Sequence, residues 1–418
     1  MQEGVFNEWS VYAGKKVLKE RAIALERIKE SSKLKIVAIS GVRRSGKTSI
    51  LILLYNLLKK QKEKVSYINL EDGRIKNNPN VLDEILKWFG DTGYLILDEI
   101  TSVDGWESWL ARNHELLKGR LNIVVSSSRS SLATPVKALR GRMITYEIYT
   151  LSFKEFLEFK DIKYENTTAG IGIMERQLQE YLIYGGFPES VLIKDYTEKI
   201  NLINTYFKDI IGLDVAEISG ENVSTVELFG KYILDAPYFS ASKCLNFFKS
   251  LGHKIAKQTL LNLESFSYGS YLFFFVSIFS RKIKDRLLYP RKAYLGDSSF
   301  MYAITGRTDM GRLFENAVFL ELKRKVPRNR DINYWKNKNE IEADFIIREG
   351  LDVKEIIQVV YEIKDEKTRK REINGLVAGA KELGLKRGLI ITKDYEGKEN
   401  VGGVNIYFIP LWKWLLSN

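Results

Sequence analysis

The stretch from residue 36 to residue 58 constrains the fold most, because it places a glycine-rich loop between a strand and a helix. Residues 36–39 are apolar and mostly β-branched, as in a buried parallel strand. Residues 41–48 read Gly-Val-Arg-Arg-Ser-Gly-Lys-Thr and match the pattern G-x-x-x-x-G-K-[ST]. Apolar residues over 48–58 recur at helical spacing. This order predicts an α/β fold with a phosphate-binding loop.

A loop of this kind binds the phosphates of a nucleoside triphosphate. Its backbone N–H groups turn inward to bind anions, and the following helix adds its positive end. We expect Lys47 to reach the β- and γ-phosphates and Thr48 to supply a hydroxyl to Mg²⁺. The predicted cofactors are ATP and Mg²⁺. The predicted nucleotide contacts in the loop are Gly41, Arg43, Arg44, Ser45, Gly46, Lys47, Thr48 and Ser49.

A second hydrophobic run, 94–97, is followed by two carboxylates, Asp98 and Glu99. After a phosphate loop this is the Walker B pattern, which puts Asp98 near Mg²⁺ and opposite Thr48. Glu99 is placed to polarise the attacking water as a general base. The pair therefore predicts hydrolysis as well as binding of ATP, with Lys47 and Glu99 as the catalytic residues.

Further polar residues lie near predicted strand ends. Ser126 and Ser127 follow a strand over 121–125 and could sense the γ-phosphate, although an ordinary serine-rich turn explains them equally well. Arg140 and Arg142 could contact phosphate in the same chain or from a neighbouring copy, but such residues are more often surface charge. These four are candidate sensor or arginine contacts.

The composition limits the class of protein. A chain of 418 residues favours roughly two to four domains over a single core. The single cysteine excludes an internal disulfide, and no apolar run approaches a membrane span. We therefore expect a soluble, cytoplasmic protein. The net charge of +12 favours nucleic acid as a partner, whereas the 28% of charged residues also suits a protein from a hot environment.

The middle of the chain changes character near residue 220. Apolar residues at helical spacing over 154–213 indicate a small helical lid on the ATPase core. Residues 222–300 read as helix, helix, turn, helix and hairpin, which is the order of a winged helix. An inward-packing winged helix that regulates the nucleotide site is the alternative to one that contacts DNA. The DNA-contact candidates on the third helix and the hairpin are Lys254, Lys257, Gln258, Lys282, Lys284 and Arg286.

The last third restarts an α/β pattern. It resembles the PD-(D/E)XK restriction-endonuclease-like fold, in which a helix carboxylate, a strand Asp and an E-x-K bind Mg²⁺ and a water. The predicted elements are a helix over 311–325, strands over 331–335, 341–347 and 356–363, a helix over 369–383 and a strand over 388–392.

The resemblance assigns the metal-binding positions of that fold to this chain. Glu315 and Asp344 match the first two positions. The third falls on the neutral Gln358, and its lysine partner falls on Val360. A literal E-x-K at 362–364 shares the strand face but is displaced along the strand. We therefore expect a degenerate domain that does not cut DNA.

Several motifs together resemble the archaeal and bacterial P-loop ATPases of the AAA+/STAND type. Besides the phosphate loop and the Walker B strand, the motifs are 68–72, Trp106, Leu-Ser-Phe-Lys-Glu-Phe at 151–156 and Gly-Gly-Phe-Pro-Glu at 185–189. The resemblance covers nearly the whole chain, with Thr150 where the family usually has proline. It implies five parallel strands with the Walker A strand central, and a contact of Pro188 on the adenine side of the nucleotide.

Four parts follow from these patterns. They are a P-loop ATPase core over 1–150, a helical lid over 151–217, a winged helix over 218–300 and a PD-(D/E)XK-like domain over 301–418. We expect an ATPase that acts on DNA or is regulated by it, and that could also bind a protein partner or a second copy. Two alternatives stay open: an ATP-dependent nuclease, and a slow, nucleotide-switched interaction module.

Overall fold

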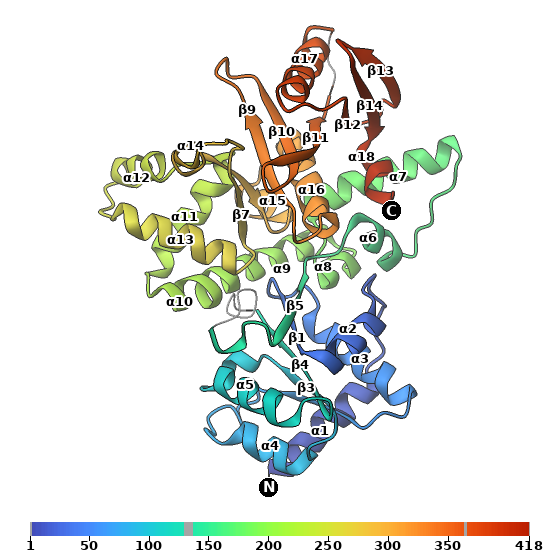
Figure 1. Cartoon of the computed structure of the whole chain (residues 1–418), viewed down its shortest axis with the longest axis vertical. Helices are drawn as coiled ribbons and strands as arrows, with labels where there is room; N and C mark the ends of the chain where they lie inside the picture. Colours follow the sequence, from blue (N-terminus) through green and yellow to red (C-terminus); the bar gives the residue numbers. More distant parts are fainter. Residues whose placement is uncertain (1, 129–136, 363–365, 418) are drawn as a thin grey trace. The chain divides into compact units, whose positions relative to one another are not determined.

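The computed structural model describes residues 2–128, 137–362 and 366–417. The chain divides into two compact units, Met1–Tyr149 and Thr150–Asn418, called the first and the second unit below (Figure 1). Within the described residues, we find no helix that is both long and apolar enough to cross a membrane.

The first unit is built on a sheet of five parallel strands in the order β2-β3-β4-β1-β5. The predicted five parallel strands are thus confirmed. The prediction that the Walker A strand is central is wrong, because β4 is the middle strand and β1 lies between β4 and β5. The strands are β1 (Ile36–Gly41), β2 (Val65–Asn69), β3 (Gly93–Asp98), β4 (Leu121–Ser127) and β5 (Met143–Ile148).

Helices cover both faces of this sheet, which explains why its strands read as continuous apolar runs (Figure 1). One apolar cluster joins the sheet to α4 and α5, and a second joins it to α2 and α3. Side chains of α1 take part in both clusters. The helices are α1 (Gln2–Lys15), α2 (Leu25–Leu34), α3 (Lys47–Lys60), α4 (Val81–Phe89) and α5 (Trp106–Leu117), with short 3₁₀ turns η1 (Ile100–Ser102) and η2 (Lys137–Leu139).

The second unit begins with helices, as predicted for 154–213. The first of them starts at a capping box in which Ser152 and Glu155 satisfy each other's backbone N–H groups. Helices α7 and α9 pack on α15 (Ser299–Thr305) of the same unit. The helices are α6 (Phe153–Phe159), α7 (Thr168–Tyr184), α8 (Pro188–Leu192) and α9 (Tyr196–Asp209), followed by the π-helical η3 (Ile210–Ala216) and by α10 (Glu217–Ser219). Their role as a lid stays a prediction.

A three-stranded antiparallel sheet, in the order β6-β8-β7, follows with its own helices. The third helix, predicted over 254–266, is shifted by three residues and not shortened: Ala256 has extended backbone angles, so the helix runs from Lys257 to Gly269 and Lys254 precedes it. The predicted hairpin also contains a short helix, α14. In chain order the elements are α11 (Val223–Asp235), β6 (Tyr238–Phe239), α12 (Ala241–Ser250), α13 (Lys257–Gly269), β7 (Phe273–Val276), α14 (Ile283–Leu288) and β8 (Arg291–Leu295).

A six-stranded mixed sheet in the order β13-β14-β12-β11-β10-β9 completes the second unit. Every element predicted for this part is found. The final β13–β14 hairpin and α18 were not predicted. The elements are α16 (Met310–Lys325), β9 (Asp331–Lys336), β10 (Glu342–Glu349), β11 (Asp352–Val360), α17 (Glu366–Glu382), β12 (Arg387–Thr392), β13 (Gly397–Val401), β14 (Val404–Pro410) and α18 (Leu411–Leu416).

The prediction that Glu362 lies on the face of strand β11 is wrong. Strand β11 ends at Val360, so Glu362 lies beyond the strand and does not share its face. Lys364, the other half of the literal E-x-K, lies outside the described residues.

Candidate functional site

The loop between β1 and α3 has the close backbone packing that its glycines predict. A Cβ at Gly41 would lie 2.0 Å from the carbonyl oxygen of Ile148 on β5, so only glycine fits there. Gly46 caps α3 with φ of 96°, which glycine adopts without strain. Arg44 has φ of 68°, an uncommon value for a residue with a side chain. The loop is therefore held in a conformation that follows from its sequence.

Lys47 is the first residue of α3, and its side chain turns back into the loop. Its ammonium donates to the carbonyl oxygens of Gly41 at 3.0 Å and Val42 at 3.1 Å. The residue is only 5% exposed. A buried ammonium enclosed by loop backbone is well placed to contact phosphate oxygens bound by the same loop.

Asp98, at the end of β3, is the shared acceptor for several hydroxyl groups of the candidate site. It is 1% exposed and accepts hydrogen bonds from the hydroxyls of Thr48 at 2.7 Å, Tyr67 at 2.8 Å and Ser126. The structure thus brings together Thr48 and Asp98, the two predicted magnesium ligands. A hydroxyl and a carboxylate are hard oxygen donors, so the pair fits Mg²⁺.

Glu99 follows in a strained conformation, with φ of 52°. Its backbone N–H donates to the Ser126 hydroxyl at 3.1 Å, and its carboxylate accepts from the Ser128 N–H at 3.2 Å. Burial raises the pKa of this carboxyl, and the negative charge of Asp98 adds to the effect, while Lys47 opposes it. A desolvated carboxylate with a raised pKa has the character of a general base.

Two residues of this site were not predicted. Tyr67 on β2 is fully buried, and its hydroxyl bond to Asp98 fixes one carboxylate oxygen. The guanidinium of Arg21 donates to the carbonyl oxygens of Ser45 at 2.7 Å and Tyr149 at 3.2 Å, and so ties the phosphate loop to the segment after β5. No motif marks Arg21. Tyr67 could have been found as a polar-tipped residue in the strand next to β3.

The carboxylate of Asp72, which follows β2, has structural partners. Asp72 accepts from the indole N–H of Trp9 at 3.0 Å and forms an ion pair with Arg74 at 2.7 Å. The hydrogen bonds from Arg74 lower the pKa of Asp72 to about 2. The Asp72 side chain therefore anchors α1 beside the end of β2.

The other candidate contacts in the first unit divide into two groups. Ser126 contacts Asp98, and the Ser127 hydroxyl lies 2.6 Å from that of Thr101.

The prediction that Arg140 or Arg142 contacts phosphate in the same chain is wrong. Both residues precede β5, whose first residue pairs with the first residue of β1, so they lie at the edge of the sheet opposite the phosphate loop. Contact with a neighbouring copy stays a prediction.

Pro188 is the first residue of α8 in the second unit, and its approach to adenine stays a prediction. The segment before it is packed around one buried carboxylate. Asp297 accepts from the N–H of Gly186 at 3.0 Å, and a Cβ at Gly185 would lie 1.7 Å from Asp297 Oδ1. Phe187 is fully buried against Tyr206. This packing explains the Gly-Gly-Phe sequence without a ligand.

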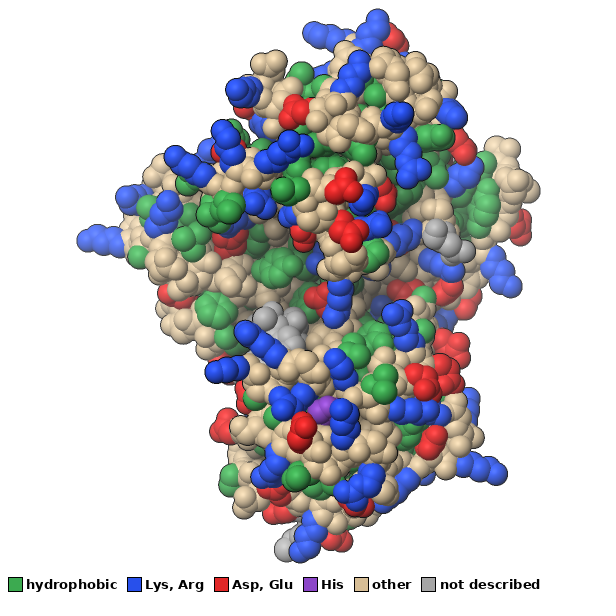
Figure 2. Space-filling model, viewed as in Figure 1, with side chains coloured by type: hydrophobic (Ala, Val, Ile, Leu, Met, Phe, Trp, Pro, Cys, Tyr) green, Lys and Arg blue, Asp and Glu red, His purple; other side chains and the backbone are tan. Residues whose placement is uncertain are grey.

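The DNA-contact candidates are mostly exposed on α13 and α14 and just before them, and Figure 2 shows Lys and Arg side chains scattered widely over the face that it draws. Lys254, Lys257, Gln258, Lys282 and Lys284 are exposed, whereas Arg286 is half-buried. The amide of Gln258 donates to Asn262 at 3.0 Å, so these two side chains hold each other.

Two further basic residues, Arg291 and Lys292 on strand β8 of the predicted hairpin, are not available to DNA. Arg291 forms an ion pair with Glu264. Lys292 is 5% exposed and points into the protein.

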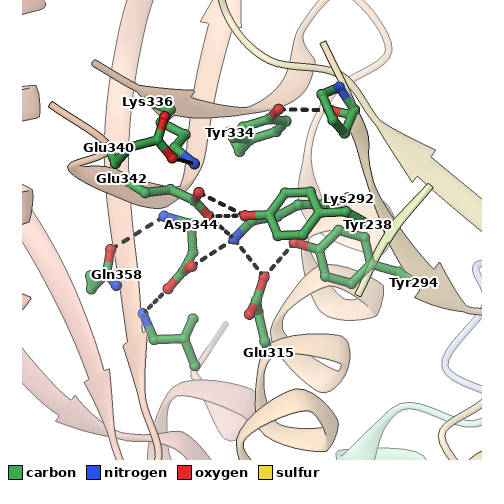
Figure 3. Close-up of polar contacts among 12 residues, drawn as sticks. Tyr238, Lys292, Tyr294, Glu315, Tyr334, Lys336, Glu340, Glu342, Asp344 and Gln358 are labelled. Carbon is green, nitrogen blue, oxygen red and sulfur yellow. Dashed lines mark hydrogen bonds and ion pairs between the residues drawn. The ribbon is translucent and has the colours of Figure 1, made fainter. Parts of the chain in front are cut away.

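The C-terminal carboxylates converge on that buried lysine (Figure 3). The ammonium of Lys292 on β8 lies 2.9 Å from Glu315 on α16, and 2.7 Å from both Glu342 and Asp344 on β10. The sequence had assigned Glu315 and Asp344 to a metal. Instead, a cation of the chain itself occupies the position between them.

Two tyrosines, Tyr238 and Tyr294, also contact these carboxylates. We call the six residues the Lys292 cluster: Lys292, Glu315, Glu342, Asp344, Tyr238 and Tyr294. The Tyr294 hydroxyl donates to Glu315 at 2.6 Å, and that of Tyr238 donates to Glu342 at 2.5 Å. Within the described part of the chain, we find no group of three or more His, Cys, Asp or Glu side chains arranged to hold a metal ion.

The third expected metal position has other partners. The Gln358 side-chain oxygen accepts from the Asp344 N–H at 3.2 Å, and its amide donates to Glu372 at 2.8 Å. Asp344 accepts from the Val359 N–H at 2.9 Å. Glutamine thus links β11 to β10 and α17, and it adds no charge.

Three family models match consecutive parts of the chain. An AAA domain model matches residues 33–157, which contain the phosphate loop and both Walker carboxylates. Two domains of unknown function, DUF8612 and DUF4143, match residues 175–311 and 310–414. The first unit therefore carries an AAA-type P-loop domain.

Among solved structures, AMPPCP-bound DnaA from Aquifex aeolicus has 16% identity and a TM-score of 0.28, covering 60% of this chain and 89% of that one. C. elegans PCH-2 has 13% identity and a TM-score of 0.28, covering 64% of this chain and 67% of that one. TM-scores this low do not establish a shared overall fold.

Full-length relatives are more informative. A protein of Haemophilus influenzae, named only as uncharacterized, is 25% identical over 90% of this chain and 94% of its own length. The uncharacterized protein MJ1544 of Methanocaldococcus jannaschii is 34% identical over 92% of this chain and 88% of its own length. This chain therefore belongs to the family of MJ1544, and its residues 33–157 are an AAA domain.

Proposed function

We propose that this protein is a Mg²⁺-dependent ATPase that binds and hydrolyses ATP at the loop between β1 and α3. The observation that carries the proposal is the contact between Thr48 and Asp98. Their side-chain oxygens lie 2.7 Å apart although the residues are 50 positions apart in the chain. A loop that only bound an anion would not need a carboxylate there, because a carboxylate repels phosphate unless a cation lies between them.

Each residue of the site has a part in this proposal. The loop N–H groups and Lys47 bind the β- and γ-phosphates, and Thr48 and Asp98 hold Mg²⁺. The bound metal would neutralise charge that develops on the phosphate oxygens. Tyr67 and Ser126 orient Asp98. Glu99 accepts the proton of the attacking water, which its burial and raised pKa support.

The test compares Lys47→Ala with Lys59→Ala, which removes an exposed lysine at the far end of α3. ATP affinity is measured by titration calorimetry, and hydrolysis by phosphate release. We expect Lys47→Ala to abolish tight ATP binding and Lys59→Ala to match the native protein. Unchanged affinity in Lys47→Ala would refute the proposed site.

For the second unit we propose the winged helix, over 218–300, that the sequence predicts. The order α11, β6, α12, α13, β7, β8 and the antiparallel sheet β6-β8-β7 support it. The exposed lysines of α13 and α14 support DNA as the partner that this unit binds, since they are suited to phosphate contacts. Helices over 151–217 would then be the lid whose movement ATP controls, with Pro188 on the adenine side.

We further propose that residues 301–418 form a PD-(D/E)XK-like domain that does not cut DNA. The Lys292 cluster supports this proposal. Cleavage needs carboxylates that are free to bind a divalent cation. Here the ammonium of Lys292 forms ion pairs with Glu315 and Asp344, and the neutral Gln358 stands at the third metal position. These residues do not fit a bound Mg²⁺.

A further inference from the structure

A groove of about 660 Å³ lies between the segment around α14 and the turn that joins β9 to β10. Its volume falls within the range of roughly 300–1,000 Å³ that is usual for ligand sites. We propose that this groove binds the sugar-phosphate chain of single-stranded nucleic acid. The proposal rests on DNA as the proposed partner and names a surface for it that differs from α13.

The two walls of the groove are fixed to each other. The N–H of Phe279 donates to the carbonyl oxygen of Tyr334 on β9 at 2.7 Å, and Ile278 forms a parallel bridge with Tyr334. The Tyr334 hydroxyl donates to the carbonyl oxygen of Pro290 at 2.7 Å. Both ends of the α14 segment are therefore attached to β9, so the groove is part of the folded structure.

The turn on the other wall is also ordered by its own hydrogen bonds. The Asn337 side-chain oxygen accepts from the N–H groups of Asn339 at 2.8 Å and Ile341 at 3.0 Å. On the first wall, the Ser280 hydroxyl donates to Asp285 at 2.7 Å and accepts from the Lys282 N–H at 3.1 Å. Each wall thus presents its charged side chains from a fixed backbone.

The charges that line the groove favour an anionic ligand. Arg281 and Lys282 project from one wall, and Lys338 from the other, and all three are exposed. Among the described residues, none of these three has an ion-pair partner. Lys336 is paired with Glu340. The carboxylates on the lining are engaged as acceptors, Asp285 from Ser280 and Glu382 from the indole of Trp335.

Cations on two opposing walls match a ligand that carries repeated negative charge between them. Tyr289 lines the same groove and is 48% exposed, so it offers a ring on which a base can stack. A groove of this volume accommodates roughly one or two nucleotides and not a duplex. These features together favour a single strand over duplex DNA. The exposed apolar residues of α14, Ile283, Leu287 and Leu288, do not line the groove.

The experiment measures binding of a fluorescein-labelled deoxythymidine oligomer to the full chain by anisotropy, over a series of salt concentrations. The groove variant is Arg281→Gln/Lys282→Gln/Lys338→Gln. Its matched control, Lys59→Gln/Lys60→Gln/Lys118→Gln, removes three exposed lysines of the first unit. We expect the groove variant to bind about tenfold or more weakly and to lose about 2 units of the salt slope, since each phosphate contact on a single strand contributes ~0.7.

A second pair of variants separates stacking from charge. Tyr289→Ala should weaken binding, whereas Tyr289→Phe should keep it, because both tyrosine and phenylalanine present an aromatic face. Neither substitution changes the net charge, so the salt slope should not move. Loss of binding in both variants would assign the effect to the hydroxyl and would overturn the stacking part of the proposal.

The remaining outcomes separate the groove from the proposed function. If the native chain binds neither single-stranded nor duplex DNA, DNA as partner is wrong, and the groove assignment falls with it. If it binds the oligomer but the groove variant binds as tightly as its control, the groove alone is wrong. If a polyglutamate peptide competes as well as the oligomer and Tyr289→Ala has no effect, an acidic protein segment replaces nucleic acid as the occupant.

Discussion

The ammonium of Lys292 lies 2.7 Å from Oδ1 of Asp344, and this ion pair joins two strands whose residues are 52 positions apart. Lys292 belongs to the three-stranded sheet, and Asp344 to the six-stranded sheet. Burial opposes the charge of the lysine, yet the pKa of Lys292 is raised well above its usual value because Asp344 and Glu315 surround it. The contact therefore holds a charged lysine inside the second unit.

Removal of this lysine should be costly. Lys292→Met leaves the buried Asp344 and the half-buried Glu315 and Glu342 without a cation, and breaking a buried ion pair in this way costs roughly 3–5 kcal/mol. We expect that loss in the free energy of unfolding, measured with urea. Lys284→Met changes an exposed lysine and should stay within about 0.5 kcal/mol of the native protein. Equal stability of the two variants would show that the cluster adds little.

The same contact predicts that the protein does not cleave nucleic acid. Plasmid, single-stranded and branched DNA are incubated with the native chain in Mg²⁺ or Mn²⁺, and the products are separated on gels. No nicking is expected, since the ammonium of Lys292 occupies the position between the carboxylates that would bind the metal. Nicking by the native chain that disappears in Asp344→Ala would instead favour the ATP-dependent nuclease.

Tyr67 should matter through Asp98 alone. Tyr67→Phe removes one of the hydrogen bonds that orient this carboxylate, and a bond to a charged group contributes roughly 1.5–3 kcal/mol. We expect the Mg²⁺ concentration for half-maximal ATP hydrolysis to rise at least about tenfold. ATP binding without metal should be unchanged. Tyr94→Phe, a buried tyrosine of β3 outside the site, is the control. Identical magnesium dependence in both variants would remove Tyr67 from the site.

The lowered pKa of Asp72 predicts how the free energy of unfolding changes with pH. Its folded pKa, about 2, is below the ordinary value of 3.8, so the native state favours its charged form. The stabilisation is present above pH 3.8 and is lost as the pH falls toward 2. The difference in unfolding free energy between the native chain and Asp72→Asn should therefore shrink from pH 5 to pH 2. A difference that stays constant over this range would mean that the Arg74 and Trp9 contacts do not act through charge.

Much of the first unit could be predicted from local sequence. The phosphate loop and the Walker B strand are short motifs whose backbone conformation follows from their glycines and apolar runs, and the structure joins them through Thr48 and Asp98. The position of β1 in the sheet could not be predicted in this way. Strand order depends on which strands pair, and no local pattern records it.

The less predictable features are side-chain contacts between distant segments. Lys292 reads as one more basic residue of the hairpin, because Arg291 beside it and Arg286 six positions earlier are basic as well. Only the fold shows that it points inward, toward carboxylates from α16 and β10. Arg21 is similar, since its carbonyl acceptors on Ser45 and Tyr149 are backbone atoms that carry no sequence signature.

The central claim is that Glu99 activates water at a working ATP site. The most direct measurement is single-turnover hydrolysis, with protein in excess over labelled ATP and rapid quenching, for the native chain and Glu99→Gln. We predict that both bind ATP with the same affinity and that the variant hydrolyses it ~100-fold or more slowly, as expected for loss of a general base. Hydrolysis at the native rate by Glu99→Gln, or ATP that stays intact on the native chain, would contradict the account.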